Sequence, residues 1–174
     1  MKQYGFYFDS TKCTGCKTCQ VSCKDEKDLD LGPKFRRVYE FGGGSWQKQD
    51  GIWQQNVYSY YLSISCNHCS NPTCVEGCPY GAPQYDEKKK LMSKCDGCYE
   101  RVAKGMKPVC VESCPQRALD FDDINVLREL HGTECGIAPM PDPSLTNPNI
   151  VIKPHKDAKP SGDKSGELKN PAEV

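Results

Sequence analysis

The chain has 174 residues, in which 23 lysines and arginines balance 23 aspartates and glutamates to a formal net charge of zero. This balance, and the lack of a basic stripe interleaved with aromatic residues, argue against a nucleic-acid-binding protein. No apolar run approaches the roughly 18 residues of a membrane-spanning helix, and the first residues lack the apolar stretch of a signal peptide. We therefore expect a soluble or peripheral protein of one domain or two small fused modules.

Cysteine is the residue type that stands out, with 13 copies. In a short secreted chain this number would suggest disulfides, but without a signal peptide we expect the cysteines to bind metal. Hydrophobic residues make up only 37% of the chain, cysteines included, so a core of side chains alone would be thin. Inorganic clusters would fill part of the interior, which would couple metal binding to folding.

The first cysteine group has the spacing of a ferredoxin-type cluster motif. Its members are Cys13, Cys16, Cys19 and Cys23. A loop that turns every three residues can point three thiolates at one cubane, and the fourth cysteine then begins a helix and points toward a second cluster. Structural zinc usually takes two separated Cys-x-x-Cys pairs, and disulfides between cysteines this close in sequence are rarely favourable.

Two more groups of four follow, and each also ends in Cys-x-x-x-Cys. They are Cys66, Cys69, Cys74 and Cys78, then Cys95, Cys98, Cys110 and Cys114. Three such groups in series indicate a repeated cluster-binding unit. His68 lies among four thiolates that already complete a ligand set, so we do not predict it to be a ligand. Cys135 stands alone and is interpreted as an ordinary cysteine.

Short strands and helices are predicted around these groups. Residues 4–9 alternate and are rich in aromatics, which is typical of a strand, and Asp123 can cap a helix that ends before Gly132. Pro33 favours an extended segment, and Gly42-Gly43-Gly44 is predicted to be a flexible turn, not a phosphate loop. The other predicted elements are helix 19–26, strand 57–64, hairpin 84–93, helix 99–104 and strand 118–121.

Two surface features leave alternatives open. The basic residues Lys34, Arg36 and Arg37 could face an acidic partner or form a solvated face. From Ala138 onward the chain is rich in proline and small polar residues and could not form its own core. It is either disordered or an arm lying on another subunit, with few contacts to its own core, and the apolar segment 150–152 favours the arm.

The sequence offers little to support catalysis. It contains no plausible Ser-His-Asp constellation, nucleotide loop or pair of catalytic carboxylates, so we assign no catalytic residue. A chain rich in one-electron centres and poor in catalytic groups is typical of an electron conduit, whose reduction potentials are tuned by hydrogen bonds and burial. The alternatives are a free-standing polyferredoxin and a structural zinc protein.

Several motifs resemble the iron–sulfur subunits of the dimethyl sulfoxide reductase family, over nearly the whole chain. They are Cys13–Cys19, Gly32–Glu40, Lys94–Cys98, Cys110–Pro115 and Asn149–Pro154. The resemblance implies a heterotrimer in which a molybdopterin catalytic subunit receives electrons from this chain and a membrane anchor oxidises quinol. It implies a peripheral location on the cytoplasmic membrane. Related polysulfide, thiosulfate and formate oxidoreductases share the cysteine groups, so the terminal substrate stays open.

We expect an α+β fold built on a ferredoxin-like 4Fe-4S module, with a second cluster-binding insert and an extended C-terminal arm. Residues 1–137 would form the iron–sulfur domain and 138–174 the proline-rich tail. Within the domain, 1–40 and 90–125 would form one two-cluster module, and 55–90 would be the insert.

The resemblance also implies how the cysteines are shared. In a ferredoxin module the fourth cysteine of each motif binds the other cluster, and by resemblance the first and third groups are partners. The three implied ligand sets are Cys13, Cys16, Cys19 and Cys114 for cluster 1, Cys95, Cys98, Cys110 and Cys23 for cluster 2, and Cys66, Cys69, Cys74 and Cys78 for cluster 3. We therefore expect three 4Fe-4S clusters.

One departure from the family concerns the number of groups, which is four in the family and three here. After Cys78-Pro79 the chain continues with Tyr80–Tyr85, which is similar to the segment after the family's third group. The end of the second group and most of the third are therefore missing. The family places the lost cluster nearest the membrane subunit, so direct coupling to quinol stays open. The alternative for cluster 3 is a site that stays empty or binds zinc.

Overall fold

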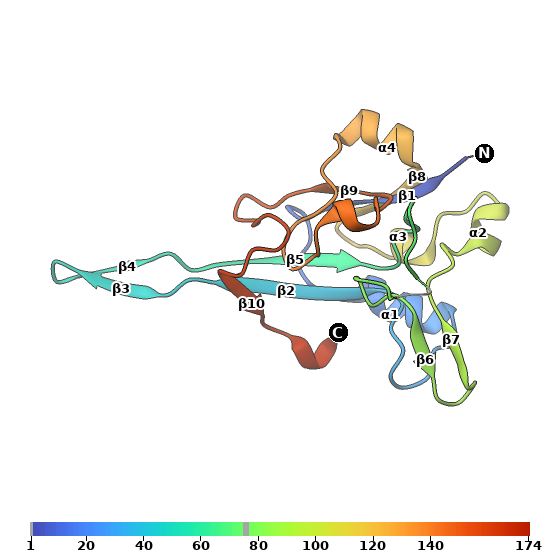
Figure 1. Ribbon diagram of the computed structural model, residues 1–174, viewed down its shortest axis with the longest axis horizontal. Helices are drawn as coiled ribbons and strands as arrows, with labels where there is room; N and C mark the ends of the chain where they lie inside the picture. The colour runs from blue at the N-terminus through green and yellow to red at the C-terminus, as the bar shows by residue number, and fades with distance from the viewer. Residues whose placement is uncertain (1, 75–76) are drawn as a thin grey trace.

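The structure is a computed structural model that describes residues 2–74 and 77–174. Within these residues the elements form two three-stranded sheets, two two-stranded ribbons and several short helices (Figure 1). They are β1 (Tyr4–Asp9), α1 (Thr18–Glu26), β2 (Arg37–Gly43), β3 (Trp46–Gln49), β4 (Ile52–Gln55), β5 (Tyr58–Ile64), β6 (Gln84–Asp86), β7 (Leu91–Ser93), α2 (Tyr99–Ala103), α3 (Val109–Glu112), β8 (Leu119–Asp123), α4 (Ile124–His131), the 3₁₀ turn η1 (Pro143–Leu145), β9 (Ile150–Lys153), β10 (Gly166–Leu168) and the 3₁₀ turn η2 (Pro171–Glu173). The α+β fold predicted from the sequence is confirmed.

The first sheet has β1 as its middle strand. β8 pairs with it antiparallel on one side and β9 pairs with it parallel on the other. Alternate side chains of a strand point to opposite faces. On one face Phe6 packs against Phe121, with ring centroids 4.8 Å apart, and on the other Tyr7 and Val151 pack against Leu127 of α4. The sheet therefore separates α4 from the cysteine-bearing loops.

Helix α4 begins and ends where its sequence predicts. The carboxylate of Asp123 accepts a hydrogen bond from the backbone N–H of Asn125 at 2.9 Å, which satisfies a donor that the helix itself cannot. Gly132 ends the helix with a φ of 87°. None of the helices in the described residues combines the length and apolar composition needed to cross a membrane.

Helices α1 and α3 bring the first and third cysteine groups together. They pack against each other, and the hydroxyls of Ser22 and Ser113 are hydrogen-bonded at 2.6 Å. Strands β1 and β8, which lead into and out of these two groups, are paired as well. Two cysteine motifs far apart in the sequence are thus packed side by side, as the predicted two-cluster module requires.

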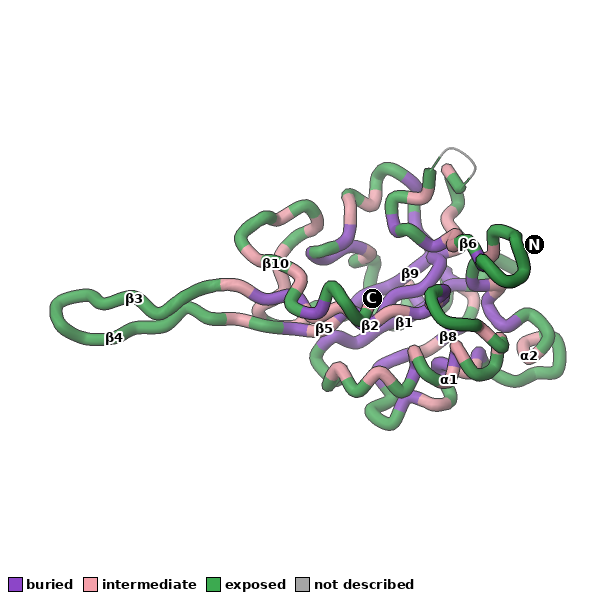
Figure 2. Tube along the Cα trace, turned by 90° about the horizontal axis from the view of Figure 1, so that it is seen from below, coloured by how far each residue is buried: buried purple, intermediate pink, exposed green. Residues whose placement is uncertain are grey.

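The second sheet extends into a projecting ribbon. β5 and β10 pair with the two edges of β2. Beyond them β3 and β4 continue away from the body of the molecule (Figure 1), and their residues are all exposed (Figure 2). Trp46 pairs with Gln55 and Lys48 with Trp53, so both tryptophans lie on one face of this ribbon. The sequence did not reveal this feature.

The flexible turn predicted at Gly42-Gly43-Gly44 is wrong. Gly42 and Gly43 belong to β2, and Gly44 follows it with a φ of 85°. A Cβ on Gly43 would lie 2.7 Å from the carbonyl oxygen of Ser165, in the segment that leads into β10. The glycine therefore serves a close approach between strands.

The prediction that residues 138–174 make few contacts with their own core is also wrong. Ile150, Val151 and Ile152 are 2%, 0% and 1% exposed, in the strand that pairs with β1. Further along, the side chain of Asn170 donates to the backbone oxygen of Val38 at 2.9 Å. The tail has no core of its own because it completes sheets that begin elsewhere in the sequence.

Candidate metal centre

All three cysteine groups begin with the same turn. The residue two positions after the first cysteine has a positive φ each time, with values of 69° at Gly15, 45° at His68 and 69° at Gly97. This region favours glycine, and at Gly15 a Cβ would also lie 2.4 Å from the ring of Tyr61. The repeat seen in the cysteine spacing therefore extends to the backbone.

His68 takes the position that glycine holds in the other two groups. Burial, and to a lesser extent the charge of Lys94, lower the pKa of His68 to about 4. The imidazole is therefore neutral at physiological pH. Its role in the structure is that of a turn residue, and the prediction that it is not a ligand stays a prediction.

A small cavity brings together one of the predicted ligand sets. The cysteines that line it are Cys13, Cys16, Cys19 and Cys114. Burial, together with the charges of the other three thiolates, raises the pKa of Cys13 to about 11, although a hydrogen bond from the N–H of Gly15 lowers it. Such a thiol is protonated at neutral pH, so a cluster would displace its proton on binding.

The second predicted set gathers around Cys23 of α1. Burial raises the pKa of Cys23 to about 12, and the thiolates of Cys110, Cys95 and Cys98 contribute to this shift. All four side chains are buried. Cys23 and Cys110 come from the packed helices α1 and α3, and the other two come from the loop between β7 and α2. Helix packing therefore places the fourth cysteine of group one beside group three.

The third predicted set is brought together in part. Cys66 is buried and Cys69 and Cys78 are half-buried, and the charges of Cys66 and Cys78 add to burial in raising the pKa of Cys69. The Nζ of Lys94 donates to the sulfur of Cys66 at 3.6 Å. Cys74 is exposed and adjoins residues 75–76, which lie outside the described residues.

The three sets lie next to one another. A negative charge on Cys110 in the second set raises the pKa of Cys19 in the first. In the same way, a negative charge on Cys66 in the third set raises the pKa of Cys95 in the second. Cys23, Cys66 and Cys95 also pack in one buried cluster. Sulfur atoms thus follow each other through the body of the molecule, an arrangement suited to passing electrons from one centre to the next.

The chemistry of the donors fits iron–sulfur clusters. All thirteen cysteines are free thiols, and thiolates are the ligands of 4Fe-4S clusters, although they also bind zinc and copper(I). Within residues 2–74 and 77–174 no three metal-ligating side chains are close enough together to hold a single ion. When bound, each cluster would accept and release one electron, and the chain's own residues would hold it and set its potential.

Sequence reasoning missed the polar groups that surround the sulfur atoms. Arg36 is 1% exposed, so the expectation that it faces an acidic partner or solvent is wrong. It is held by Ser63, whose Oγ lies 3.3 Å from the sulfur of Cys19. The alternation of Ser63 and Ser65 with apolar residues just before Cys66 was the signal that could have revealed a polar face directed inward.

Comparison with known proteins points the same way. The family described as the 4Fe-4S dicluster domain matches residues 73–124. The chain is 52% identical to the B subunit of anaerobic dimethyl sulfoxide reductase of Escherichia coli K12, over 99% of this chain and 98% of that protein. It is 51% identical to the corresponding subunit of Haemophilus influenzae over the full length of both. The thiosulfate reductase electron transfer subunit PhsB of Salmonella typhi is 34% identical over 58% of this chain and 51% of that protein.

The lengths of these alignments are informative. They run over 202 positions with the E. coli protein and 205 with the H. influenzae protein, more than the 174 residues of this chain. The relatives therefore contain residues that have no counterpart here. This agrees with the shortened segment inferred from the count of cysteine groups.

Proposed function

This protein belongs to the family of iron–sulfur B subunits of the anaerobic dimethyl sulfoxide reductases, which are electron-transfer subunits, and we propose that it relays electrons to a molybdopterin catalytic subunit that reduces dimethyl sulfoxide. The observation that carries this proposal is the series of three adjacent cysteine sets, in a chain that matches such a subunit over 99% of its length. Other relatives are named as subunits of a formate dehydrogenase and a thiosulfate reductase, so formate and thiosulfate are the alternative substrates of the complex.

The proposal includes the ligand sets. Cluster 1 would be bound by the four cysteines that line the small cavity, and cluster 2 by Cys23 together with Cys95, Cys98 and Cys110. Cluster 3 would be bound by the second group. The cavity and the neighbours of Cys23 support the first two assignments, and the proximity of Cys66, Cys69 and Cys78 supports the third.

Iron analysis tests the number of clusters. We expect about 12 irons and about 12 sulfides per chain after anaerobic purification, because the twelve grouped cysteines suffice for three cubanes. A value of about 8 irons would mean that the second group is not a cluster site. A colourless protein with zinc in place of iron would contradict the electron-transfer role altogether.

The partner is tested by native purification. The folded tail no longer favours an arm over a free carrier, so the relay is preferred to a free-standing polyferredoxin on family membership. We expect a tagged chain, purified anaerobically from its own cells, to retain a large molybdenum-containing subunit. Dithionite-reduced clusters should then be reoxidised by dimethyl sulfoxide only while that subunit is present, with thiosulfate as the comparison electron acceptor. Formate is compared in the opposite direction, as an electron donor that would reduce the oxidised clusters. A fully iron-loaded chain that always purifies alone would support the polyferredoxin.

The membrane anchor and the peripheral location belong to the same proposal. A third, membrane-bound subunit in the native purification would support both. Because one cysteine group is missing, we propose that the chain receives its electrons through three clusters instead of four. Reduction of these clusters by a quinol analogue in the membrane-bound complex, but not in the isolated subunit, is the expected result.

A further inference from the structure

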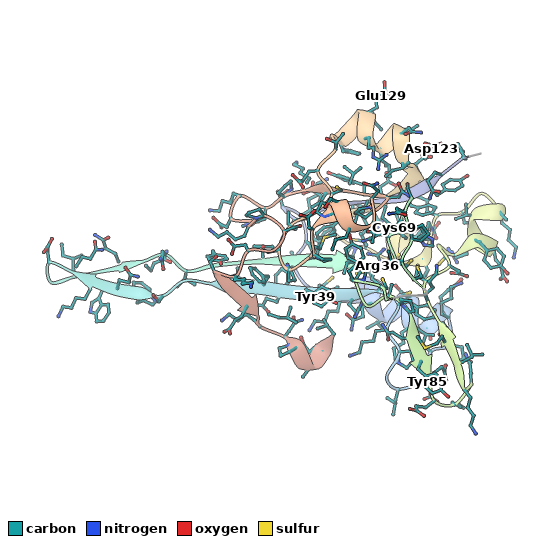
Figure 3. The ribbon with its side chains drawn as sticks, in the orientation of Figure 1. Arg36, Tyr39, Cys69, Tyr85, Asp123 and Glu129 are labelled. Carbon is teal, nitrogen blue, oxygen red and sulfur yellow. The ribbon has the colours of Figure 1, made fainter. Side chains whose placement is uncertain are left out.

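Arg36 is the largest of the fully buried side chains, with 1% of its surface exposed. It directly precedes β2 and lies in the body of the molecule, away from the projecting ribbon (Figure 3). Its Nη1 donates to the backbone oxygen and the Oγ of Ser63, both at 3.2 Å, and its Nη2 donates to the Oγ of Ser65 at 2.9 Å. The guanidinium carbon lies 4.6 Å from the centre of the Phe6 ring.

These partners are all neutral. In the part of the chain that the structure describes, no carboxylate is within ion-pair distance of Arg36, and its buried Nε has no hydrogen-bond partner. Arginine keeps its proton in proteins, and a buried charge without a compensating charge costs a large amount of free energy. A buried guanidinium in this position therefore calls for a negative group beside it.

The groups that face Arg36 are cysteines of the proposed ligand sets, which become thiolates when they bind a cluster. Burial alone would lower the pKa of Arg36, but the thiolates of Cys110, Cys19, Cys95 and Cys23 raise it. Cys19 belongs to the ligand set of cluster 1, and the other three belong to the set of cluster 2. Arg36 is therefore close to cysteines of both sets, and Ser63 links it directly to Cys19 of the first.

We propose that the fixed charge of Arg36, buried beside cysteines of both ligand sets, raises the reduction potentials of clusters 1 and 2. The inference deepens the proposed function and rests on its ligand sets. Reduction adds one negative charge to a cluster, and a cation in a medium of low dielectric constant stabilises the reduced state more than the oxidised one. Because the guanidinium stays charged at any physiological pH, this effect does not depend on pH.

Ser63 connects the cation to cluster 1 in particular. Its Oγ accepts a hydrogen bond from Arg36 and lies 3.3 Å from the sulfur of Cys19, so its own proton can be donated to that sulfur. A hydrogen bond to a ligand sulfur stabilises the reduced cluster, and the guanidinium polarises the hydroxyl. Removal of the hydroxyl should therefore affect cluster 1 and spare cluster 2.

The test is a redox titration, followed by electron paramagnetic resonance, of the full chain purified anaerobically. In Arg36→Met we expect the equilibrium constant for reduction of clusters 1 and 2 to fall at least tenfold, which is about 59 mV for a one-electron centre. The potential of cluster 3 should fall less than those of clusters 1 and 2, because Arg36 is linked to that ligand set only through Ser65, which precedes Cys66. Arg36→Lys retains the positive charge and should lower the potentials of clusters 1 and 2 much less than Arg36→Met does. The matched control is Arg37→Met, because Arg37 donates instead to the backbone oxygens of Tyr80 and Gly81.

Each outcome decides the inference. Unchanged potentials in an iron-loaded Arg36→Met variant would overturn it, and so would equal shifts of all three clusters, which would indicate general loosening. If Arg36→Met does not hold its clusters, Ser63→Ala decides. A lower reduction potential of cluster 1 alone supports the inference, and an unchanged potential of cluster 1 overturns it. Failure of the proposed function would look different, because the unaltered chain would then lack the clusters.

Discussion

Replacing Cys13 and Cys114 together with alanine is expected to cost the chain no more iron than replacing either one alone. Both cysteines line the same cavity, and we propose that they bind the same cluster, so losing either empties one site and leaves about 8 of about 12 irons. The double replacement of Cys13 and Cys23 is expected to leave about 4 irons, because Cys23 would bind the other cluster. Iron and sulfide analysis of the anaerobically purified variants measures this directly.

The thirteenth cysteine provides the matched control. Cys135 is half-buried and stands apart from the three groups, so Cys135→Ala should keep the full iron content. The electron paramagnetic resonance signal lost in Cys114→Ala should be the one lost in Cys13→Ala. If the double variant of Cys13 and Cys23 instead matches the single variants, each group binds its own cluster and the exchange of fourth cysteines does not occur.

Deleting residues 147–174 is expected to prevent the chain from folding and loading its clusters. The deletion removes β9, whose Ile150, Val151 and Ile152 are almost completely buried beside β1. Truncating one buried isoleucine to alanine typically costs about 2–5 kcal/mol, and a whole domain is stable by only about 5–15 kcal/mol. β1 leads into the first cysteine group. Without its partner strand, β1 should no longer hold that group in place, and cluster binding should be lost. Soluble yield and iron content measure the outcome.

A shorter deletion separates this effect from mere loss of the C-terminus. Removing residues 171–174 takes away η2 and the ion pair between Lys17 and Glu173, while Asn170 keeps its hydrogen bonds to β2. This variant should retain its clusters, because an exposed ion pair contributes little to stability. Full iron content and an unchanged melting temperature after deletion of 147–174 would show that β9 is dispensable, contrary to its burial.

Much of the local structure could be predicted because it depends on residues close together in the sequence. The alternation over residues 4–9 and the cap at Asp123 both gave elements with the expected type and nearly the expected ends. The cysteine spacing identified the kind of centre for the same reason, since a tight loop with thiolates at every third residue has few other uses. Even the family could be inferred from such motifs.

The places where prediction failed share a different cause. Gly42 and Gly43 look like a turn in sequence, but Gly43 allows the approach of the segment that leads into β10, more than 100 residues later, and Gly42 allows the approach of Tyr58 in β5. The tail looks like an arm because it lacks a core of its own, but it is the third strand of a sheet that begins at Tyr4. Contacts between distant segments leave no local periodicity.

The sequence by itself identified the atoms that we propose as cluster ligands, because only thiolates occur at that spacing. The tertiary structure decided what surrounds those atoms. In sequence Arg36 is one of three basic residues in a polar stretch, with nothing to distinguish it from Arg37. Packing of α1 against α3, and pairing of β2 with β5, bury Arg36 beside the grouped cysteines and leave Arg37 partly exposed. Burial depends on the sum of such long-range contacts, and a charge acts strongly on a nearby cluster only where it is shielded from water, as we propose for Arg36.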